Sequence, residues 1–247
     1  MTQEPLIHVL NRSLSLLQAP EGFRTSMDSV MLAAACPIKP EQTVLDLGCG
    51  VGSAGLCVLK RVPQTQLTGI DIQNDHIELS RKNAINNNME ERTSFLCADI
   101  RNDLEIATFD HIICNPPYKR AGAHKHSPSP SKAQAMGHLE DSSNLQSWIT
   151  RAWHHIKGQG SLTIVHEAEQ ADSIIHALYS ENGRRRFGAV EIIPLYPKAD
   201  TPAKRVLIRA YKHKKAGTTI HPGIIMHEAD GSYTKKANDI LRHMASL

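Results

Sequence analysis

The stretch VLDLGCGVG, residues 44–52, stands where an apolar run gives way to helical spacing, and it decides the fold. Gly48, Gly50 and Gly52 let the backbone turn tightly and approach a ligand closely. The third glycine comes one position too early for the dinucleotide-binding fingerprint, and Ser53 occupies the expected place. Asp46 precedes the turn, where a carboxylate suits an ammonium group better than a pyrophosphate. The stretch therefore predicts a strand, a ligand-binding turn and a helix.

Apolar runs and segments with helical spacing alternate from residue 43 onward. This pattern predicts strands at 43–47, 67–71, 93–97, 109–114, 161–165, 188–195 and 205–212, and helices at 52–61, 74–87, 142–157 and 168–180. Such alternation is typical of parallel strands covered by helices on both faces. We therefore expect an α/β fold with a mostly parallel, seven-stranded sheet.

Two further acids end predicted strands, Asp71 in LTGIDIQ and Asp99 in FLCADI. Open α/β sheets bind ligands at the carboxyl ends of their strands, so both acids should meet Asp46 in one crevice. Asp71 is placed to accept hydrogen bonds from two ribose hydroxyls, and Asp99 to accept one from the amine of an adenine. Each such bond to a charged acceptor contributes about 1.5–3 kcal/mol. The acids predict a ligand with an adenosine and a cationic amino-acid tail.

A second motif, Asn-Pro-Pro-Tyr, ends the apolar run in DHIICNPPYKR, residues 110–120. Asn115 offers a side-chain carbonyl, and Pro116 offers a backbone carbonyl without a competing N–H. Tyr118 supplies a flat face for stacking, worth roughly 1–3 kcal/mol per base. The prolines fix the backbone, so neither acceptor has to reorganise. The motif predicts a site that holds both hydrogens of a planar amine beside the crevice.

The remaining segments predict one domain over residues 1–247, without repeats. Residues 1–40 should form a short extension that covers the ligand site: two strands in 6–18, then a helix with Thr25 or Ser26 as its N-cap. Residues 41–215 form the expected core. Residues 216–247 are expected to be a basic C-terminal tail that ends in a helix near 234–245.

Charge is distributed unevenly along the chain. Residues 184–247 carry 13 Lys and Arg against 5 Asp and Glu, whereas residues 1–183 carry 15 against 20. A basic C-terminal quarter predicts a polyanionic partner contacted by one face, with a merely solvated surface as the alternative. Lys119, Arg120, Lys125 and Lys132 fall in a polar loop without an acid, which suits clamping of phosphates.

Composition also bears on the compartment. The five cysteines are odd in number and form no CxxC pair, as expected of free thiols in a reducing cytoplasm. The sequence has no apolar stretch long enough for a membrane span and no pattern of a secretion signal, so we expect a cytoplasmic protein without a membrane partner. His124 and His126 lack a neighbouring thiol or carboxylate, so we expect no metal site.

These motifs resemble known families. The DxGxGxG form of residues 46–52, followed by Asp71 and Asp99, resembles class I S-adenosylmethionine-dependent methyltransferases, which are Rossmann-like. Asn-Pro-Pro-Tyr resembles the signature of enzymes that methylate planar exocyclic nitrogens, namely adenine N6 or the glutamine N5 of release factors. GFRTSMDSVMLAA, YPKADTPAKRVLIRAYK and GSYT resemble the tRNA adenine-N6 methyltransferases that modify the adenosine beside the valine anticodon.

The resemblance implies S-adenosylmethionine as the cofactor and RNA, most simply tRNA, as the partner. It implies cofactor contacts from Arg24, Asp28, Asp46, Gly48, Gly50, Gly52, Asp71, Ile72, Asp99, Ile100 and Asn115. It implies catalytic roles for Asn115, Pro116 and Tyr118. It implies substrate contacts from Pro117, Lys119, Arg120, His138, Lys204 and Arg205. His138 stands in AMGHLED, where the family usually carries an Arg-His-Glu element.

Two rival functions stay open at this point. A glutamine-N5 protein methyltransferase would share the glycine turn and the Asn-Pro-Pro-Tyr motif, although the basic C-terminal quarter favours RNA. A cofactor-binding RNA adaptor without activity would bind RNA but transfer no methyl group. The sequence leaves the oligomeric state open between a monomer and a weak dimer.

Overall fold

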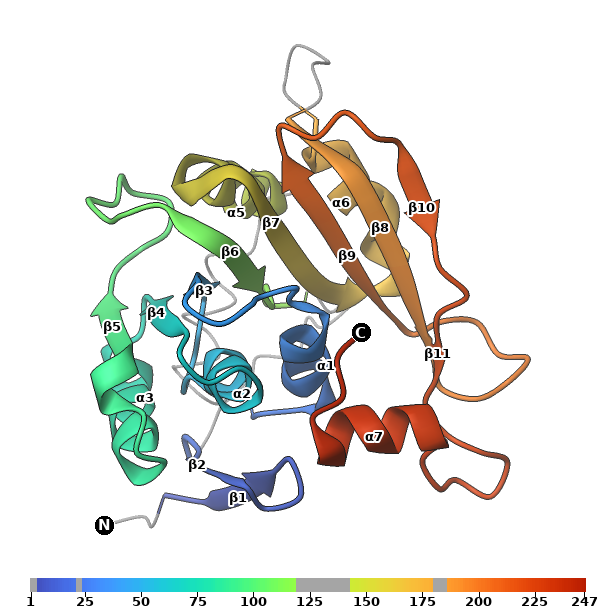
Figure 1. The fold of residues 1–247 in the computed structure, drawn as a ribbon, viewed down its shortest axis with the longest axis horizontal. Helices are drawn as coiled ribbons and strands as arrows, with labels where there is room; N and C mark the ends of the chain where they lie inside the picture. Colours follow the sequence, from blue (N-terminus) through green and yellow to red (C-terminus); the bar gives the residue numbers. More distant parts are fainter. Residues whose placement is uncertain (1–3, 21–23, 119–142, 180–185) are drawn as a thin grey trace, which may run out of the picture.

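A computed structural model describes residues 4–20, 24–118, 143–179 and 186–247 of the chain. A large central sheet has helices packed on both of its faces, and a small two-stranded sheet lies near the N-terminus (Figure 1). The strands of the central sheet are β3 (Thr43–Leu47), β4 (Gln66–Asp71), β5 (Thr93–Cys97), β6 (Phe109–Cys114), β7 (Ile156–Glu167), β8 (Phe187–Tyr196), β9 (Arg205–Lys212), β10 (Thr218–Ile220) and β11 (Ile224–Ile225).

The strands follow the order β10-β8-β9-β7-β6-β3-β4-β5, and β11 pairs with the far end of β8. Strand β9 runs antiparallel to β7 and β8, whereas all other neighbours pair in parallel. The carboxyl ends of β3, β4, β5 and β6 therefore meet at one edge. The α/β fold with a mostly parallel sheet is confirmed.

The seven strands expected between residues 43 and 212 are all present, but the described residues form nine strands in this sheet. The two additional strands, β10 and β11, lie in the segment expected to be a tail. Each pairs in parallel with β8 through only two or three residues. Segments this short show no hydrophobic period, so the sequence pattern could not reveal them.

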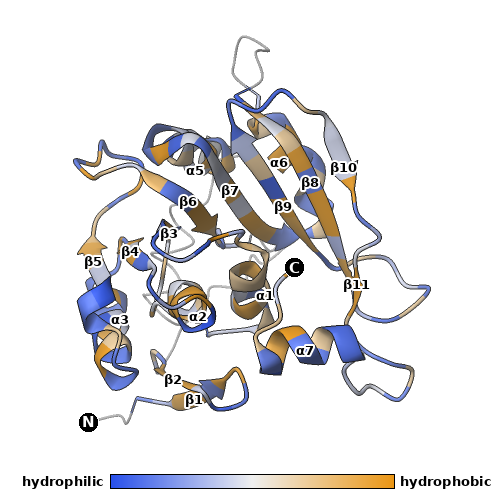
Figure 2. Cartoon of the chain, viewed as in Figure 1, coloured by the Kyte–Doolittle hydropathy of each residue, from blue (hydrophilic) through white to orange (hydrophobic). Residues whose placement is uncertain are grey.

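Helices cover both faces of the sheet. Helices α1 (Met27–Ala35), α2 (Ser53–Arg61), α3 (Asn74–Asn86) and α7 (Lys235–His243) contribute to one apolar core, and α5 (Ser143–His155) and α6 (Ala171–Ala177) contribute to the other. Neighbouring residues of β6 divide between the cores, because Ile113 packs with the first and Ile112 with the second. Hydrophobic residues accordingly predominate along β6 and α1 (Figure 2).

The N-terminal extension has the expected elements: strands β1 (Leu6–Val9) and β2 (Leu14–Leu17), then α1. Ser26 caps α1 by accepting a hydrogen bond from the backbone N–H of Asp28. The hairpin lies against α3, where the side-chain oxygen of Asn83 accepts a 2.7 Å bond from the N–H of Leu17. Its strands do not line the pocket described below. Residues 24–26, Asp28 and Ser29 do so instead.

The C-terminal segment is folded onto the body of the protein. Ala237 and Ile240 of α7 are buried, and the N–H of Leu247 donates a 3.0 Å hydrogen bond to the carbonyl of Ala34 in α1. Residues 216–247 carry three Lys and Arg against three Asp and Glu, so the basic charge of the C-terminal quarter lies before this segment. The expectation of a basic tail is therefore wrong, because the segment is packed against the body and its basic and acidic residues are equal in number.

Cys97 is exposed and the other cysteines are buried, all as free thiols. Among the described residues, none of the helices combines the length and the apolar character that crossing a membrane requires.

Candidate active site

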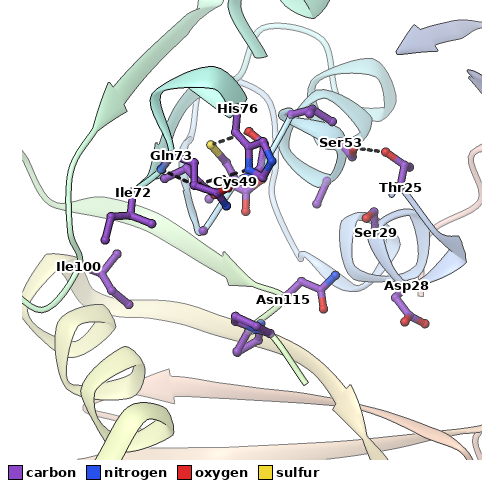
Figure 3. Close-up of a pocket in the computed structure, with 18 of the residues that line it drawn as sticks. Thr25, Asp28, Ser29, Cys49, Ser53, Ile72, Gln73, His76, Ile100 and Asn115 are labelled. Carbon is purple, nitrogen blue, oxygen red and sulfur yellow. Dashed lines mark hydrogen bonds and ion pairs between the residues drawn. The ribbon is translucent and has the colours of Figure 1, made fainter. Parts of the chain in front are cut away.

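A pocket of about 410 Å³ opens at the carboxyl ends of β3, β4, β5 and β6. Helix α1 closes one side, and Trp148 of α5 and Arg205 of β9 complete the wall. Ile72 and Ile100 lie together at one end of the pocket, whereas Asp28 and Thr25 lie at the other (Figure 3). The pocket therefore sits where open α/β sheets bind ligands.

The glycine turn forms the floor of the pocket. Gly48, Gly50 and Gly52 all have positive φ angles, of 70°, 53° and 83°. A Cβ atom at Gly48 would overlap the indole ring of Trp148, whereas one at Gly50 would meet no atom of the described residues within 4 Å. Gly48 thus permits close packing of α5, and Gly50 keeps open a space that a ligand can use. Gly52 caps α2 and packs near Ser80, outside the pocket wall.

Asp71 lies at the end of β4 and fastens the turn. One carboxylate oxygen accepts a 2.9 Å hydrogen bond from the N–H of Gly50, and the other accepts one of 2.9 Å from the N–H of Gln73. A carboxylate has about four acceptor positions, so Asp71 retains capacity for two hydroxyl groups. This arrangement fits the predicted ribose contact.

Asp46 is almost fully buried at the base of the pocket. Its carboxylate accepts a 3.0 Å hydrogen bond from the N–H of Gly55 in the first turn of α2, where the helix dipole favours negative charge. The pKa of Asp46 is nevertheless raised to about 7, chiefly by burial and to a smaller extent by the charge of Asp71. Asp46 thus anchors the turn to α2 in addition to lining the pocket.

Asp99 and the two isoleucines form the far end of the pocket. Ile72 follows β4 and Ile100 follows β5, so apolar side chains from neighbouring loops face a common space (Figure 3). Asp99 lines the same end, but its carboxylate receives hydrogen bonds from the backbone and the guanidinium of Arg101. An adenine amine would have to share Asp99 with Arg101, a competition that the sequence did not reveal.

Asn115 and Pro116 lie directly after β6, beside the pocket. Strand β6 pairs with β3 so that Cys114 stands opposite Leu47, which brings Asn115 alongside the glycine turn. Asn115 is half-buried, and Pro116 is buried. The two predicted acceptors are thus held at the pocket wall by the central strand pair of the sheet.

Tyr118 and Arg205 meet at Asp28. The hydroxyl of Tyr118 lies 2.9 Å from Oδ1 of Asn115 and 3.1 Å from Oδ2 of Asp28. Nε of Arg205 donates a 3.1 Å hydrogen bond to the same oxygen of Asp28. The Arg205 guanidinium also lies over the Tyr118 ring, 4.9 Å from its centroid, and the ring of His166 is 4.8 Å from it. The ring that was expected to stack on a base is therefore held by four neighbours.

The structure brings most of the predicted site residues together, all lining the pocket: Arg24, Asp28, Asp46, Gly48, Gly50, Asp71, Ile72, Asp99, Ile100, Asn115, Pro116, Pro117, Tyr118 and Arg205. Gly52 and the exposed Lys204 lie outside the wall. Lys119, Arg120 and His138 fall outside the described residues, as do His124 and His126. In the described part of the chain, His, Cys, Asp and Glu side chains form no group of three that could hold a metal.

Several residues of the pocket wall were not predicted as site residues, and Trp148 and His76 are two of them. Trp148 lies in the helix predicted at 142–157, but helical spacing alone could not show that its ring reaches Gly48. His76 is buried in the wall, with Nδ1 3.7 Å from the carboxylate of Asp71. A histidine in a predicted helix cannot be assigned to a binding site from the sequence, because the sequence does not show which strand end the helix lies beside.

The sheet order and the pocket at its carboxyl edge define a Rossmann-like methyltransferase, as the resemblance implied. The chain belongs to the methyltransferase small domain family, whose pattern matches residues 25–184.

Comparisons with individual proteins agree with this assignment. The chain is 24% identical to a tRNA1(Val) (adenine(37)-N6)-methyltransferase of Vibrio campbellii, over 89% of this chain and 88% of the relative. It is 37% identical to a release factor glutamine methyltransferase of Rhodopirellula baltica, but over only 32% of this chain and 27% of the relative. The crystal structure of a predicted O-methyltransferase from Agrobacterium tumefaciens superposes with a TM-score of 0.72 at 24% identity, covering 89% and 97% of the two chains. That likeness supports the fold alone.

Proposed function

We propose that the protein transfers a methyl group from S-adenosylmethionine to N6 of an adenosine in RNA, specifically in tRNA beside the anticodon. The observation that carries the proposal is the position of Asn115. Its side-chain carbonyl stands at the end of β6, in the wall of a pocket whose other contacts suit the cofactor.

The pocket residues fit the cofactor in each of its parts. Gly50 leaves room for close approach, and Asp71 keeps acceptor capacity for ribose hydroxyls. Ile72 and Ile100 offer apolar walls to an adenine ring. Arg24, exposed at the rim, is placed to pair with the carboxylate of the methionine end. When bound, S-adenosylmethionine supplies a methyl group activated on its sulfonium.

The substrate amine is held by acceptors of the chain itself. Oδ1 of Asn115 and the carbonyl of Pro116 would each accept one hydrogen of the amine, which turns the nitrogen lone pair out of conjugation. Because both acceptors are fixed by β6 and the proline backbone, they need no reorganisation during the reaction. Removing one preorganised hydrogen-bonding group of this kind costs about 2.7–4 kcal/mol of transition-state stabilisation.

The RNA substrate is inferred from relatives and from charge. Relatives that match most of this chain are named tRNA1(Val) (adenine(37)-N6)-methyltransferases. Arg205 lines the pocket, and Lys198 and Lys204 lie in the loop before it. We assign this rim to the RNA backbone, so binding should weaken steeply with salt.

A second candidate is methylation of a glutamine N5 in a release factor. The Asn-Pro-Pro-Tyr motif would hold a glutamine amide in the same way as an adenine amine, and one relative with that name matches a segment of 81 residues. This rival predicts labelled protein and weak dependence on salt.

One labelling experiment separates the two candidates. The purified protein is incubated with tritium-labelled S-adenosylmethionine and either a tRNA transcript or a release factor. We expect label in the tRNA, recovered as N6-methyladenosine, and none from an Asn115→Ala variant. Asn86→Ala, at an exposed position on α3, is the matched control and should retain full activity. Label confined to the release factor would replace the RNA assignment.

A further inference from the structure

The hydroxyl of Tyr118 lies between two acceptors at the substrate end of the pocket. Oδ1 of Asn115 is 2.9 Å away and Oδ2 of Asp28 is 3.1 Å away. A phenol has a single proton to donate, so the two oxygens compete for it. Figure 3 shows Asn115 and Asp28 next to each other in this part of the pocket.

The competition matters because the amide oxygen has another task. Under the proposed function, on which this inference rests, Oδ1 of Asn115 must accept a hydrogen from the target amine. A tyrosine hydroxyl bonded to the same oxygen is a rival donor within the protein. Desolvation by burial, reinforced by the charge of Asp28, holds the pKa of Tyr118 far above its usual value, so the hydroxyl stays protonated and remains a donor at every working pH.

The carboxylate of Asp28 is the stronger acceptor for the Tyr118 hydroxyl. It lies in the first turn of α1, is only 5% exposed, and carries a full negative charge when ionised. A hydrogen bond to a charged acceptor is roughly twice as strong as one between neutral groups. Arg205 fixes the oxygen that faces Tyr118, because its Nε donates to that same Oδ2 at 3.1 Å. The other oxygen of Asp28 is buried and has no hydrogen-bond partner among the residues that the structure describes.

We propose that Asp28 is a positioning residue that holds the Tyr118 hydroxyl, so that the amide oxygen of Asn115 is free for the target amine. Asp28 acts through Tyr118 and does not touch the reacting atoms. Arg205 serves the same purpose by pinning both the carboxylate and, through its contact with the ring, the tyrosine itself.

A double-mutant cycle tests this role through the dependence of one substitution on the other. In Asp28→Asn the charged acceptor is lost, and the hydroxyl turns to Asn115. We expect the methyl-transfer rate at saturating tRNA and cofactor to fall about tenfold, as a difference of about 1.4 kcal/mol implies. Tyr118→Phe has no hydroxyl to misplace, so Asp28→Asn should lower the rate less than about twofold in that background. The double variant should therefore be faster than Asp28→Asn alone.

A purely structural role for Asp28 gives the opposite result. The loss caused by Asp28→Asn would then be equal in the tyrosine and phenylalanine backgrounds, which contradicts the proposal. Titration with S-adenosylhomocysteine provides the second readout, and we expect unchanged affinity in all variants. Weaker binding in both backgrounds would assign Asp28 to the cofactor site instead, which also overturns the proposal.

The control is an aspartate at the same position of another helix. Asp75→Asn is matched in position, because Asp75 is the second residue of α3 as Asp28 is of α1, and it is exposed. It should leave the rate unchanged. If Asp28→Asn folds poorly, Asp28→Ser removes the same charge and is compared in both backgrounds. A wild-type protein that methylates no adenosine contradicts the proposed function, whereas an active wild type without the rescue contradicts this inference alone.

Discussion

The backbone N–H of Gly50 donates a 2.9 Å hydrogen bond to the carboxylate of Asp71, which ties the glycine turn after β3 to the end of the neighbouring strand β4. The N–H groups of Gly48 and Cys49 donate to the carbonyl of Ile70 on the same strand, at 2.8 and 2.9 Å. The floor of the pocket is therefore part of the sheet, and a ligand that contacts Asp71 meets a rigid surface.

Replacing Asp71 by alanine should weaken cofactor binding. The variant loses a charged acceptor for ribose hydroxyls and the anchor of Gly50, and each such hydrogen bond is worth about 1.5–3 kcal/mol. We expect the dissociation constant for S-adenosylhomocysteine, measured by calorimetry, to rise by at least about tenfold. Glu78→Ala, at an exposed position on α3, is the control. Equal affinity of the Asp71 variant and the control would remove Asp71 from the site.

Two glycines of the same turn should respond differently to alanine. Gly48→Ala places a methyl group into the ring of Trp148 and strains a positive φ, so it should destabilise the fold by more than about 2 kcal/mol. Gly50→Ala is strained, but its methyl group meets no atom in the described part of the chain, so it should destabilise the fold by about 1 kcal/mol. The same methyl group should obstruct the ligand. Urea unfolding and cofactor titration measure the two effects.

The contrast between the two variants is the test. In Gly50→Ala the main effect should be weaker cofactor binding, with only a small decrease in the free energy of unfolding. In Gly48→Ala the free energy of unfolding should decrease strongly. Equal loss of stability at both positions would mean that the crowding at Trp148 has no consequence.

Asp46 should make stability fall as the pH rises. Its pKa is raised from 3.8 to about 7, chiefly by burial, so between about pH 4 and 7 the folded protein holds a proton that the unfolded chain releases. The free energy of unfolding therefore decreases across this window. Asp46→Asn removes this contribution, and the comparison cancels residues that titrate in both proteins, such as His111 and His166.

Urea unfolding of both proteins at pH 5 and pH 7.5 measures this effect. We expect the wild type to lose stability relative to Asp46→Asn between the two values. A difference in stability that is the same at both pH values would contradict the raised pKa.

Helix α7 should contribute to stability through its buried side. Ile240 is 1% exposed and packs in the core that contains α1, so Ile240→Ala should cost about 2–5 kcal/mol. Lys236→Ala, on the exposed side of α7, should change the unfolding free energy by less than about 0.5 kcal/mol. Chemical denaturation distinguishes this result from a loosely attached tail, for which both substitutions would be harmless.

The sequence was most informative where a local pattern and a topological rule agree. The three closely spaced glycines and the alternating apolar runs predicted the turn after β3 and the parallel core, because backbone preference and hydrophobic period act over short segments. The rule that ligands bind at the carboxyl edge of the sheet then placed the acids at the strand ends in one ligand site.

What the sequence could not predict depends on contacts between distant residues. Asp28 and Arg205 are separated by 177 positions, and only the fold brings their side chains together. The contact of Trp148 with Gly48 likewise joins residues that are far apart in the chain. The contact of Arg101 with Asp99 is local, but it depends on a side-chain conformation that the sequence does not specify. The strands β10 and β11 were missed because two or three residues at a sheet edge leave no period to detect.

The most direct test of the central claim, that Asn115 presents an adenine amine for methylation, is nucleoside analysis of cellular tRNA. A strain lacking this protein is complemented with the wild type or with Asn115→Ala, and digested tRNA is examined by mass spectrometry. We predict N6-methyladenosine with the wild type and none with the variant, at equal protein levels. Recovery of the modification by Asn115→Ala, or its absence with the wild type, would contradict the account.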